Sequence, residues 1–196
     1  MNKRLSMINQ IISNLESNLV VYKNINSFST KPGIYAIGYS AELFPPLLAK
    51  DKIKKEKIIY IGKTESSQEK RDEKTHFYSG GTKSSTLRRS IGAILREELK
   101  LIPIPRSCSE NTEKRFTNYC FDERGEKLLT KWMSDNLSLS FCELNGPVDE
   151  METIEIDIIQ QLKPILNLRN NKDNPWRKEL KKLRKNCSVL AKQYRY

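Results

Sequence analysis

The sequence predicts a small α/β (α+β) domain in which a three-stranded mixed β-sheet is flanked by helices, with helical extensions at both ends. Three apolar, β-branched runs indicate strands, at residues 34–37, 57–62 and 137–142. Amphipathic helices are predicted to follow Ser85 and Pro147. A chain of 196 residues with 37% hydrophobic side chains is long enough to bury a core.

The first thirty residues are predicted to form an N-terminal extension. Their apolar residues recur at the spacing of a peripheral helix, at Leu5, Ile8, Ile11, Ile12 and Leu15. A short extended run at 19–22 follows, and Pro32-Gly33 then interrupts the chain before the first strand. We therefore expect the main domain to occupy residues 31–170.

The middle of the chain is polar from 63 to 83, and Ser84-Ser85 then offers an N-cap for a helix. The apolar stripe of that helix consists of Leu87, Ile91, Ile94 and Leu95. We expect the helix to end before Pro103, because proline stops a helix. Residues 116–121 favour a short strand, and residues 126–134 favour a helix.

The helix after Gly146-Pro147 carries an acidic residue on its apolar face and ends before Lys163-Pro164. A projection at about 100° per residue places Glu155 inside the stripe formed by Met151, Ile154, Ile158 and Leu162. Burying an unpaired carboxylate costs many kcal/mol. We therefore expect Glu155 to be protonated, paired with Arg or Lys in a structural salt bridge, or bound to a metal.

The charge of the chain is strongly positive and concentrated at one end. The formal net charge is +11. Residues 168–196 carry ten Lys and Arg against Asp173 and Glu179. We predict a basic helical tail over 171–196, with an inner face of Leu180, Leu183, Val189 and Leu190. Its outer residues either remain solvated or contact the phosphates of DNA, and we favour DNA contact by Lys178, Lys181, Lys182, Arg184 and Lys185.

Several protein classes are excluded by composition. The four cysteines are scattered without a CxxC pair and His76 is the only histidine, which argues against a zinc finger or a His-rich metal site. No apolar stretch approaches the roughly 18 residues that a membrane span needs. The first residues lack the apolar core of a signal peptide, so we expect a cytoplasmic protein with reduced thiols.

Two tripeptides on the first two predicted strands, Gly33-Ile34-Tyr35 and Tyr60-Ile61-Gly62, resemble the signature of the GIY-YIG nuclease superfamily. The further elements of the family pattern follow in order as Arg71, Glu155 and Asn167, with Pro164 between the last two. The segment from His76 through Gly80-Gly81 to Leu87-Arg88-Arg89 is also similar to homing-type members. The resemblance covers about residues 31–167 and singles out the same glutamate as the helical projection.

The resemblance implies a divalent-metal-dependent endonuclease that hydrolyses phosphodiester bonds. Glu155 would then hold Mg²⁺ or Mn²⁺, and Arg71 would clamp the phosphate. The resemblance assigns Tyr35 to orienting or deprotonating the water, with Tyr60 in support. A phenol needs a neighbouring cation to act as a base at neutral pH, and Lys63 is near enough in sequence to provide it. It also suggests His76 as a proton carrier and a largely structural role for Asn167.

Some alternatives remain open at the level of sequence. One insertion separates the two tripeptides and another precedes the third strand, which makes the register after Gly62 uncertain. Arg88 or Arg89 could therefore take the role of Arg71. Both arginines are also candidates for nucleic-acid contact. A second function is a non-catalytic nucleic-acid-binding module on the same scaffold. A third is a nuclease that uses an Asp with a Glu-x-Lys pair such as Glu98-Leu99-Lys100, but no suitable Asp precedes it. DNA is the favoured partner, while RNA, the substrate specificity and the oligomeric state stay open.

Overall fold

The computed structural model describes residues 3–39, 58–65, 67, 76–106, 113–144 and 148–195, and the side chains of all of these except 148 and 149. The chain divides into two compact units. Unit 1 comprises Met1–Arg71 and Ser134–Pro175, and unit 2 comprises Asp72–Met133 and Trp176–Tyr196. Each unit contains two separate stretches of the chain, so each is closed by contacts between residues far apart in sequence.

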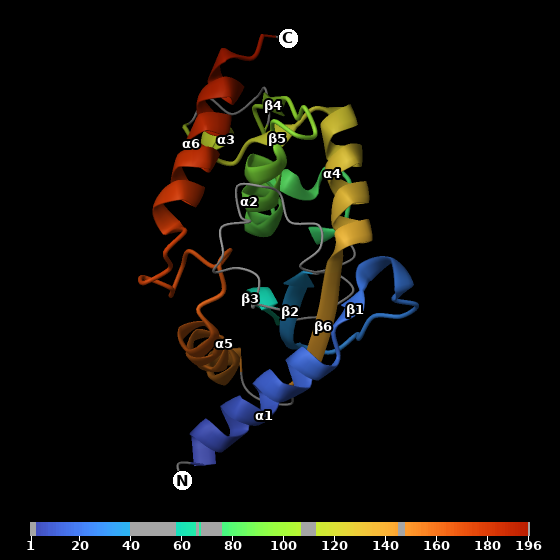
Figure 1. The fold of residues 1–196 in the computed structure, drawn as a ribbon, viewed down its shortest axis with the longest axis vertical. Coiled ribbons are helices and arrows are strands. Elements are labelled where there is room, and N and C mark those ends of the chain that lie inside the picture. The colour runs from blue at the N-terminus through green and yellow to red at the C-terminus, as the bar shows by residue number, and fades with distance from the viewer. Residues whose placement is uncertain are drawn as a thin grey trace. The chain divides into compact units, whose positions relative to one another are not determined.

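Unit 1 is built on a four-stranded sheet in the order β1-β6-β2-β3 (Figure 1). The strands are β1 (Val20–Val21), β2 (Gly33–Tyr39), β3 (Ile58–Thr64) and β6 (Leu137–Glu143), and a short 3-10 helix, η1 (Tyr22–Asn24), follows β1. Every pairing is antiparallel. The α+β class and the three predicted strands are confirmed, but the predicted three-stranded mixed sheet is wrong, because β1 adds a fourth strand and the described pairings are antiparallel. Near-continuous apolar runs are typical of parallel strands, and here they occur because both faces of the antiparallel strands β2 and β3 are buried.

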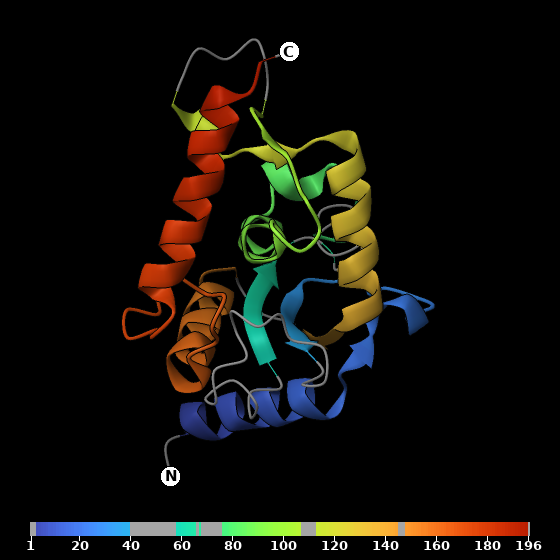
Figure 2. The same cartoon turned by 45° about the horizontal axis from the view of Figure 1, so that its top comes forward.

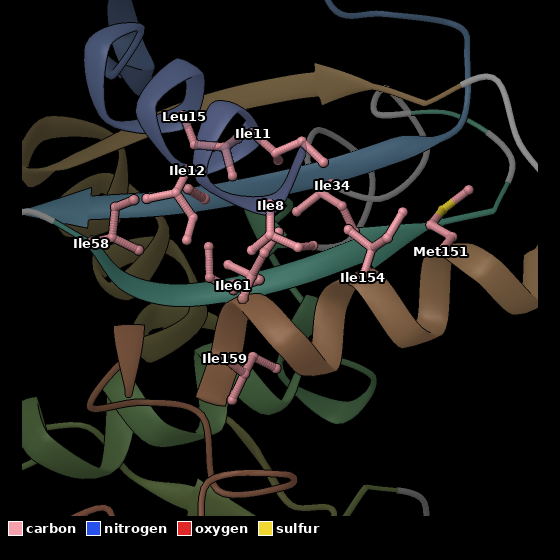
Figure 3. Close-up of a cluster of buried hydrophobic side chains, with 12 residues drawn as sticks. Ile8, Ile11, Ile12, Leu15, Ile34, Ile58, Ile61, Met151, Ile154 and Ile159 are labelled. Carbon is pink, nitrogen blue, oxygen red and sulfur yellow. The ribbon is translucent and has the colours of Figure 1, made fainter. Parts of the chain in front are cut away.

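Two helices of unit 1, α1 (Lys3–Ser17) and α5 (Val148–Leu162), pack on one face of this sheet. Figure 3 shows isoleucines from both helices meeting Ile34 and Ile61 of the strands. The N-terminal helix was predicted to be peripheral, but it contributes four residues to this core, Ile8, Ile11, Ile12 and Leu15. The predicted stripe of α5 is confirmed at Met151, Ile154 and Ile158, which are buried in the same cluster.

Unit 2 is mainly helical. Its elements are η4 (Gly81–Lys83), α2 (Thr86–Leu95), β4 (Pro103–Ile104), α3 (Lys114–Thr117), β5 (Cys120–Phe121), α4 (Glu123–Asn136, whose last turn belongs to unit 1) and α6 (Arg177–Gln193). Figure 2 shows α2 between α4 and α6. The predicted strand at 116–121 is shorter than expected, because α3 occupies its first residues and only Cys120 and Phe121 pair with β4.

The predicted N-cap of α2 is confirmed, since the Ser85 side chain accepts a hydrogen bond from the backbone N–H of Arg88. The C-terminal helix α6 is part of unit 2 and packs against α2, α3 and β4. Its buried face is Leu180, Cys187 and Ala191. Val189 was predicted to face inward but is 44% exposed, because the helical spacing from Leu180 selects Cys187 and Ala191 instead.

Candidate active site

Tyr35 and Tyr60 lie side by side on one face of the sheet. In the antiparallel pair of β2 and β3, Tyr35 is opposite Gly62 and Ile37 is opposite Tyr60, so these side chains share a face. The two phenol rings have centroids 6.1 Å apart and are tilted by 34°. Since Ile34 and Ala36 alternate with Tyr35, the tyrosine pair lies on the face opposite α1 and α5.

Gly62 allows this arrangement because it has no side chain. A Cβ at Gly62 would be 2.2 Å from the hydroxyl oxygen of Tyr35, so the phenol rests directly on the backbone of β3. A Cβ at Gly33 would be 2.3 Å from the carbonyl oxygen of Cys142 on β6. Both glycines are therefore required by close approach, and neither takes part in chemistry.

Lys63 is surrounded by carboxylates at the end of β3. Its Nζ is 2.7 Å from Oε1 of Glu65 and 3.8 Å from Oε2 of Glu152. The hydrogen bond to the Glu65 carboxylate raises the pKa of the Lys63 ammonium above its ordinary value. The charges of Glu152 and Glu155 add to this rise and partial burial opposes it. Lys63 is therefore a fixed positive charge at neutral pH and not a base.

Glu155 is half-buried on α5, beside the apolar stripe that packs into the core. Its negative charge is the weakest of the named contributions that raise the pKa of Lys63, and the expected pairing of this carboxylate with a cation stays a prediction. Tyr60 and Lys63 both belong to β3. This strand carries Tyr60 on one face, and its Lys63 lies opposite Ile34, a core residue of the other face.

The donor set at Glu155 is compatible with a hard divalent cation that takes most of its ligands from water and substrate. Among the described residues, no three His, Cys, Asp or Glu side chains converge in the manner of an all-protein metal cage. Mg²⁺ is commonly held by one or two carboxylates together with waters and phosphate oxygens. A single half-buried carboxylate therefore fits Mg²⁺ better than it fits zinc, which requires three or four protein ligands.

Asn167 fastens the chain after α5 to the outer edge of β3. Its Oδ1 accepts a hydrogen bond from the N–H of Ile61 at 2.8 Å, and its Nδ2 donates to the Ile61 carbonyl at 2.8 Å. The backbone N–H of Leu166 also donates to the carbonyl of Ile59. The side chain thus takes the place of a neighbouring strand at the residue between Tyr60 and Gly62. The observed contacts of Asn167 are structural.

The comparison with protein families gives a match over most of the chain. Residues 33–186 match the family model described as the GIY-YIG catalytic domain, which covers more than half of the chain. The chain belongs to the GIY-YIG catalytic domain family. The match begins at the first residue of the first tripeptide and ends within α6. Comparisons with curated proteins and with solved structures gave no match.

This membership sets the broad function. The GIY-YIG family consists generally of endonucleases, so the fold is of a nuclease type and nucleic acid is the substrate class that the family implies. Divalent metal dependence is typical of GIY-YIG nucleases.

Among the described residues, no helix has the length and apolar character that crossing a bilayer requires.

The other predicted residues of the GIY-YIG site lie in unit 2 or outside the described residues. Arg71 lies outside the described residues. His76 is fully buried in unit 2, and its Nδ1 is 2.7 Å from the hydroxyl of Ser85, the N-cap of α2. His76 is therefore held by the first turn of α2, and its role as a proton carrier stays a prediction.

Arg88 was predicted as a nucleic-acid contact or an alternative phosphate clamp, and the structure corrects this. Its side chain is fully buried, with Nη2 2.7 Å from Oε2 of Glu126. Its other nitrogens donate to the Thr82 hydroxyl, the His76 carbonyl and the Thr130 hydroxyl. Burial lowers the pKa of Arg88 and the Glu126 carboxylate opposes that shift. Because its guanidinium is used inside unit 2, Arg88 has a structural role.

Arg89 needs the same correction. It is 7% exposed, and its Nη1 donates to the carbonyls of Thr82 and Lys83 while Nη2 donates to the hydroxyl of Thr86. The guanidinium thus ties η4 to the first turn of α2. An arginine that satisfies backbone carbonyls in this way is not presented to a phosphate.

The predicted basic surface of α6 is present. Lys178, Lys181, Lys182 and Lys185 are exposed and Arg184 is half-buried, while Leu180, Cys187 and Ala191 form the opposite face. The helix therefore keeps its cations in solvent and its apolar residues against unit 2. Contact of these cations with nucleic acid is not tested by the structure and stays a prediction.

Two residues with structural roles, Glu126 and Glu152, were not predicted from the sequence. Glu126 is 4% exposed and neutralises Arg88, but it lies 38 positions away, so no local pattern connects the two. Glu152 contacts both Lys63 and Arg169. Its position three residues before Glu155, on the same side of a helix, is a signal that could have identified it.

Proposed function

We propose that this chain is a divalent-metal-dependent endonuclease that hydrolyses phosphodiester bonds in DNA. The observation that carries the proposal is the tyrosine pair, with the Tyr35 phenol resting on Gly62 in a chain that belongs to the GIY-YIG family. In this proposal Tyr35 activates or orients the attacking water and Tyr60 supports it. Glu155 is the metal ligand, and Arg71 is the phosphate clamp.

The chemistry of a buried phenol explains why Lys63 belongs to the proposed site. A tyrosine has an ordinary pKa near 10 and needs a positive charge nearby to lose its proton at neutral pH. Lys63 follows Gly62, the residue that faces the Tyr35 phenol, and its raised pKa keeps it protonated. Its side chain lies on the other face of β3, so in the proposal its charge acts on the phenol across the strand and not by direct contact. The proton of the water would pass to the phenol oxygen of Tyr35.

Glu155 is the residue that would hold Mg²⁺ or Mn²⁺. A bound divalent cation would act as a Lewis acid and stabilise the charge on the phosphate and the leaving oxygen. The Lys63 ammonium forms its ion pairs with Glu65 and Glu152, and these two carboxylates reduce its repulsion of a cation at Glu155.

Arg71 is the remaining candidate for the phosphate clamp among the three arginines that the family pattern offers. Arg88 and Arg89 are buried and their guanidinium groups bond to unit 2 itself. A phosphate clamp requires a permanently charged, bidentate group that substrate can reach. This elimination supports Arg71.

The exposed lysines of α6 support a polyanionic substrate. Duplex DNA carries one charge per approximately 1.7 Å of axis, and cations that neutralise phosphates contribute affinity without reading sequence. Lys178, Lys181, Lys182 and Lys185 provide such a surface together with Arg184. In the proposal this surface adds affinity for DNA that does not depend on its sequence.

The test is a substrate panel with and without metal. Purified protein is incubated with supercoiled, linear, branched and single-stranded DNA and with RNA, in Mg²⁺, in Mn²⁺ and in EDTA. We expect nicking or cutting of DNA with either cation and none in EDTA. Binding without cleavage in every metal would instead indicate a non-catalytic nucleic-acid-binding module, and cleavage of RNA alone would overturn DNA as the substrate.

A further inference from the structure

A polar pocket lies at the C-terminal end of α5 in unit 1. Its volume is about 420 Å³, and it is lined by Gln160, Lys163, Asn170, Asn171, Lys172 and Asp173. None of these residues has a role in the proposed hydrolysis. We propose that this pocket binds a backbone phosphate of the DNA strand, at a position away from the bond that is cut. This inference rests on the proposed function, because it takes nucleic acid as the substrate.

The walls of the pocket are preformed by buried asparagines. The Asn171 Nδ2 donates to the carbonyl of Pro164 at 2.9 Å. The Asn174 Nδ2 donates to the carbonyls of Ile165 at 2.7 Å and Asn167 at 3.1 Å. These bonds hold the segment between α5 and α6 in one conformation. Binding to such a pocket therefore loses little free energy to ordering of the protein.

The lining has the chemistry of an anion site. Lys163 and Lys172 supply ammonium groups, and the amide side chains of Gln160 and Asn170 add further donors. The one carboxylate, Asp173, leaves a net positive charge, and its Oδ2 is 4.0 Å from Nζ of Lys163. This pair is largely exposed, so it contributes little to stability and does not prevent Lys163 from binding a phosphate.

The pocket is fixed to the strand that carries the proposed site. Leu166 and Asn167, which precede the pocket loop, are hydrogen-bonded to Ile59 and Ile61 of β3. Between them and the pocket lies Arg169, whose Nη2 is 3.6 Å from Glu152.

Glu152 in turn lies 3.8 Å from Lys63 on β3. A connected series of charged groups therefore extends from Lys63 through Glu152 and Arg169 to the loop that forms the pocket. A nucleic-acid strand presents a phosphate about every 3.4 Å along the duplex axis, so it requires cations at successive positions. The arrangement suits a strand that is held at more than its reacting phosphate.

The test compares two double variants in DNA binding without metal. Lys163→Ala/Lys172→Ala removes both pocket ammonium groups. Lys23→Ala/Lys31→Ala removes two lysines of unit 1 whose exposed fractions, 56% and 58%, match the 57% of Lys163 and which also face one surface carboxylate each. Affinity for a labelled duplex is measured by fluorescence anisotropy in EDTA over a range of KCl concentrations.

The pocket variant is expected to bind less tightly, and the slope of log affinity against log salt should fall by about 1 for each lysine that contacts a phosphate. The control variant should keep the slope of the unmodified protein. An unchanged slope in the pocket variant, or an equal fall in the control, would overturn the proposal.

A second arm distinguishes a strand phosphate from a free one. Inorganic phosphate and a mononucleotide are titrated into both variants by calorimetry. If either binds through Lys163 and Lys172 while the DNA slope is unchanged, the pocket is a site for a free phosphate and the proposal fails. Because binding is measured in EDTA, a protein that cuts nothing but shows the expected slopes would refute the hydrolysis and leave the pocket proposal intact.

Discussion

Gly62 lies directly beneath the phenol of Tyr35, and a Cβ at this glycine would be 2.2 Å from the Tyr35 hydroxyl oxygen. No real structure tolerates that separation, so any side chain at position 62 must displace the phenol. Tyr35 is fully buried and cannot move aside freely. The last glycine of the second tripeptide therefore sets the position of the tyrosine of the first.

Gly62→Ala should lower the rate of DNA cleavage by about 100-fold, because displacements near 1 Å in a reacting group can cost that much. The rate is measured with supercoiled plasmid at a temperature where the protein remains folded. Gly33→Ala is the matched control, since its Cβ would collide with the Cys142 carbonyl and the Phe141 ring and not with a phenol. If both variants lose activity only in proportion to their loss of folded protein, Gly62 does not position Tyr35.

Asn167→Ala should destabilise unit 1 by about 1–3 kcal/mol, because it removes the hydrogen-bond partners of both the backbone N–H and the carbonyl of Ile61 at the edge of β3. Denaturant unfolding measures the change. Gln161→Ala is the control, since it removes an exposed amide that bonds to Asn9 and should cost no more than about 0.5 kcal/mol. Equal stability of the two variants would contradict the structural role of Asn167.

Removing the exposed lysines of α6 should weaken DNA binding uniformly across sequences and reduce its salt dependence. Point substitutions are needed, because deleting the helix would also remove its buried residues Leu180, Cys187 and Ala191. The test variant replaces Lys178, Lys181, Lys182 and Lys185 by alanine. The control replaces four exposed lysines elsewhere in unit 2, namely Lys83, Lys100, Lys114 and Lys127. A salt slope that falls equally in both would show that only total charge matters.

Replacing either member of the buried pair of Arg88 and Glu126 should lower the free energy of unfolding by about 3–5 kcal/mol, because the remaining charge stays buried without its partner. Arg88→Met, Glu126→Leu and the double variant form a cycle that is measured by denaturant unfolding. The double variant should lose less than the sum of the two single losses. If Arg88→Met lowers the free energy of unfolding by less than about 1 kcal/mol but greatly weakens DNA binding, Arg88 is a nucleic-acid contact after all.

The sequence was sufficient to predict features that depend on local spacing. The two tripeptides lie on adjacent strands, and the predicted stripe of α5 contains the core residues Met151, Ile154 and Ile158.

The features that the sequence did not predict depend on partners distant in the chain. Arg88 and Arg89 resemble surface residues until Glu126 and the carbonyls of η4 are seen beside them. Strand direction and the burial of α1 also follow from packing and not from periodicity. A charged residue next to an apolar stripe is therefore ambiguous in sequence, since it can be a solvated group, as on α6, or a buried one, as on α2.

The central claim is that Glu155 holds the cation that hydrolysis requires. The most direct measurement is metal-dependent plasmid cleavage by Glu155→Gln, a variant of nearly the same shape without the negative charge, together with circular dichroism and DNA binding in EDTA. We expect cleavage to be lost at every Mg²⁺ and Mn²⁺ concentration while the spectrum and the binding are retained. Cleavage at the rate of the unmodified protein, with the same metal dependence, would contradict it.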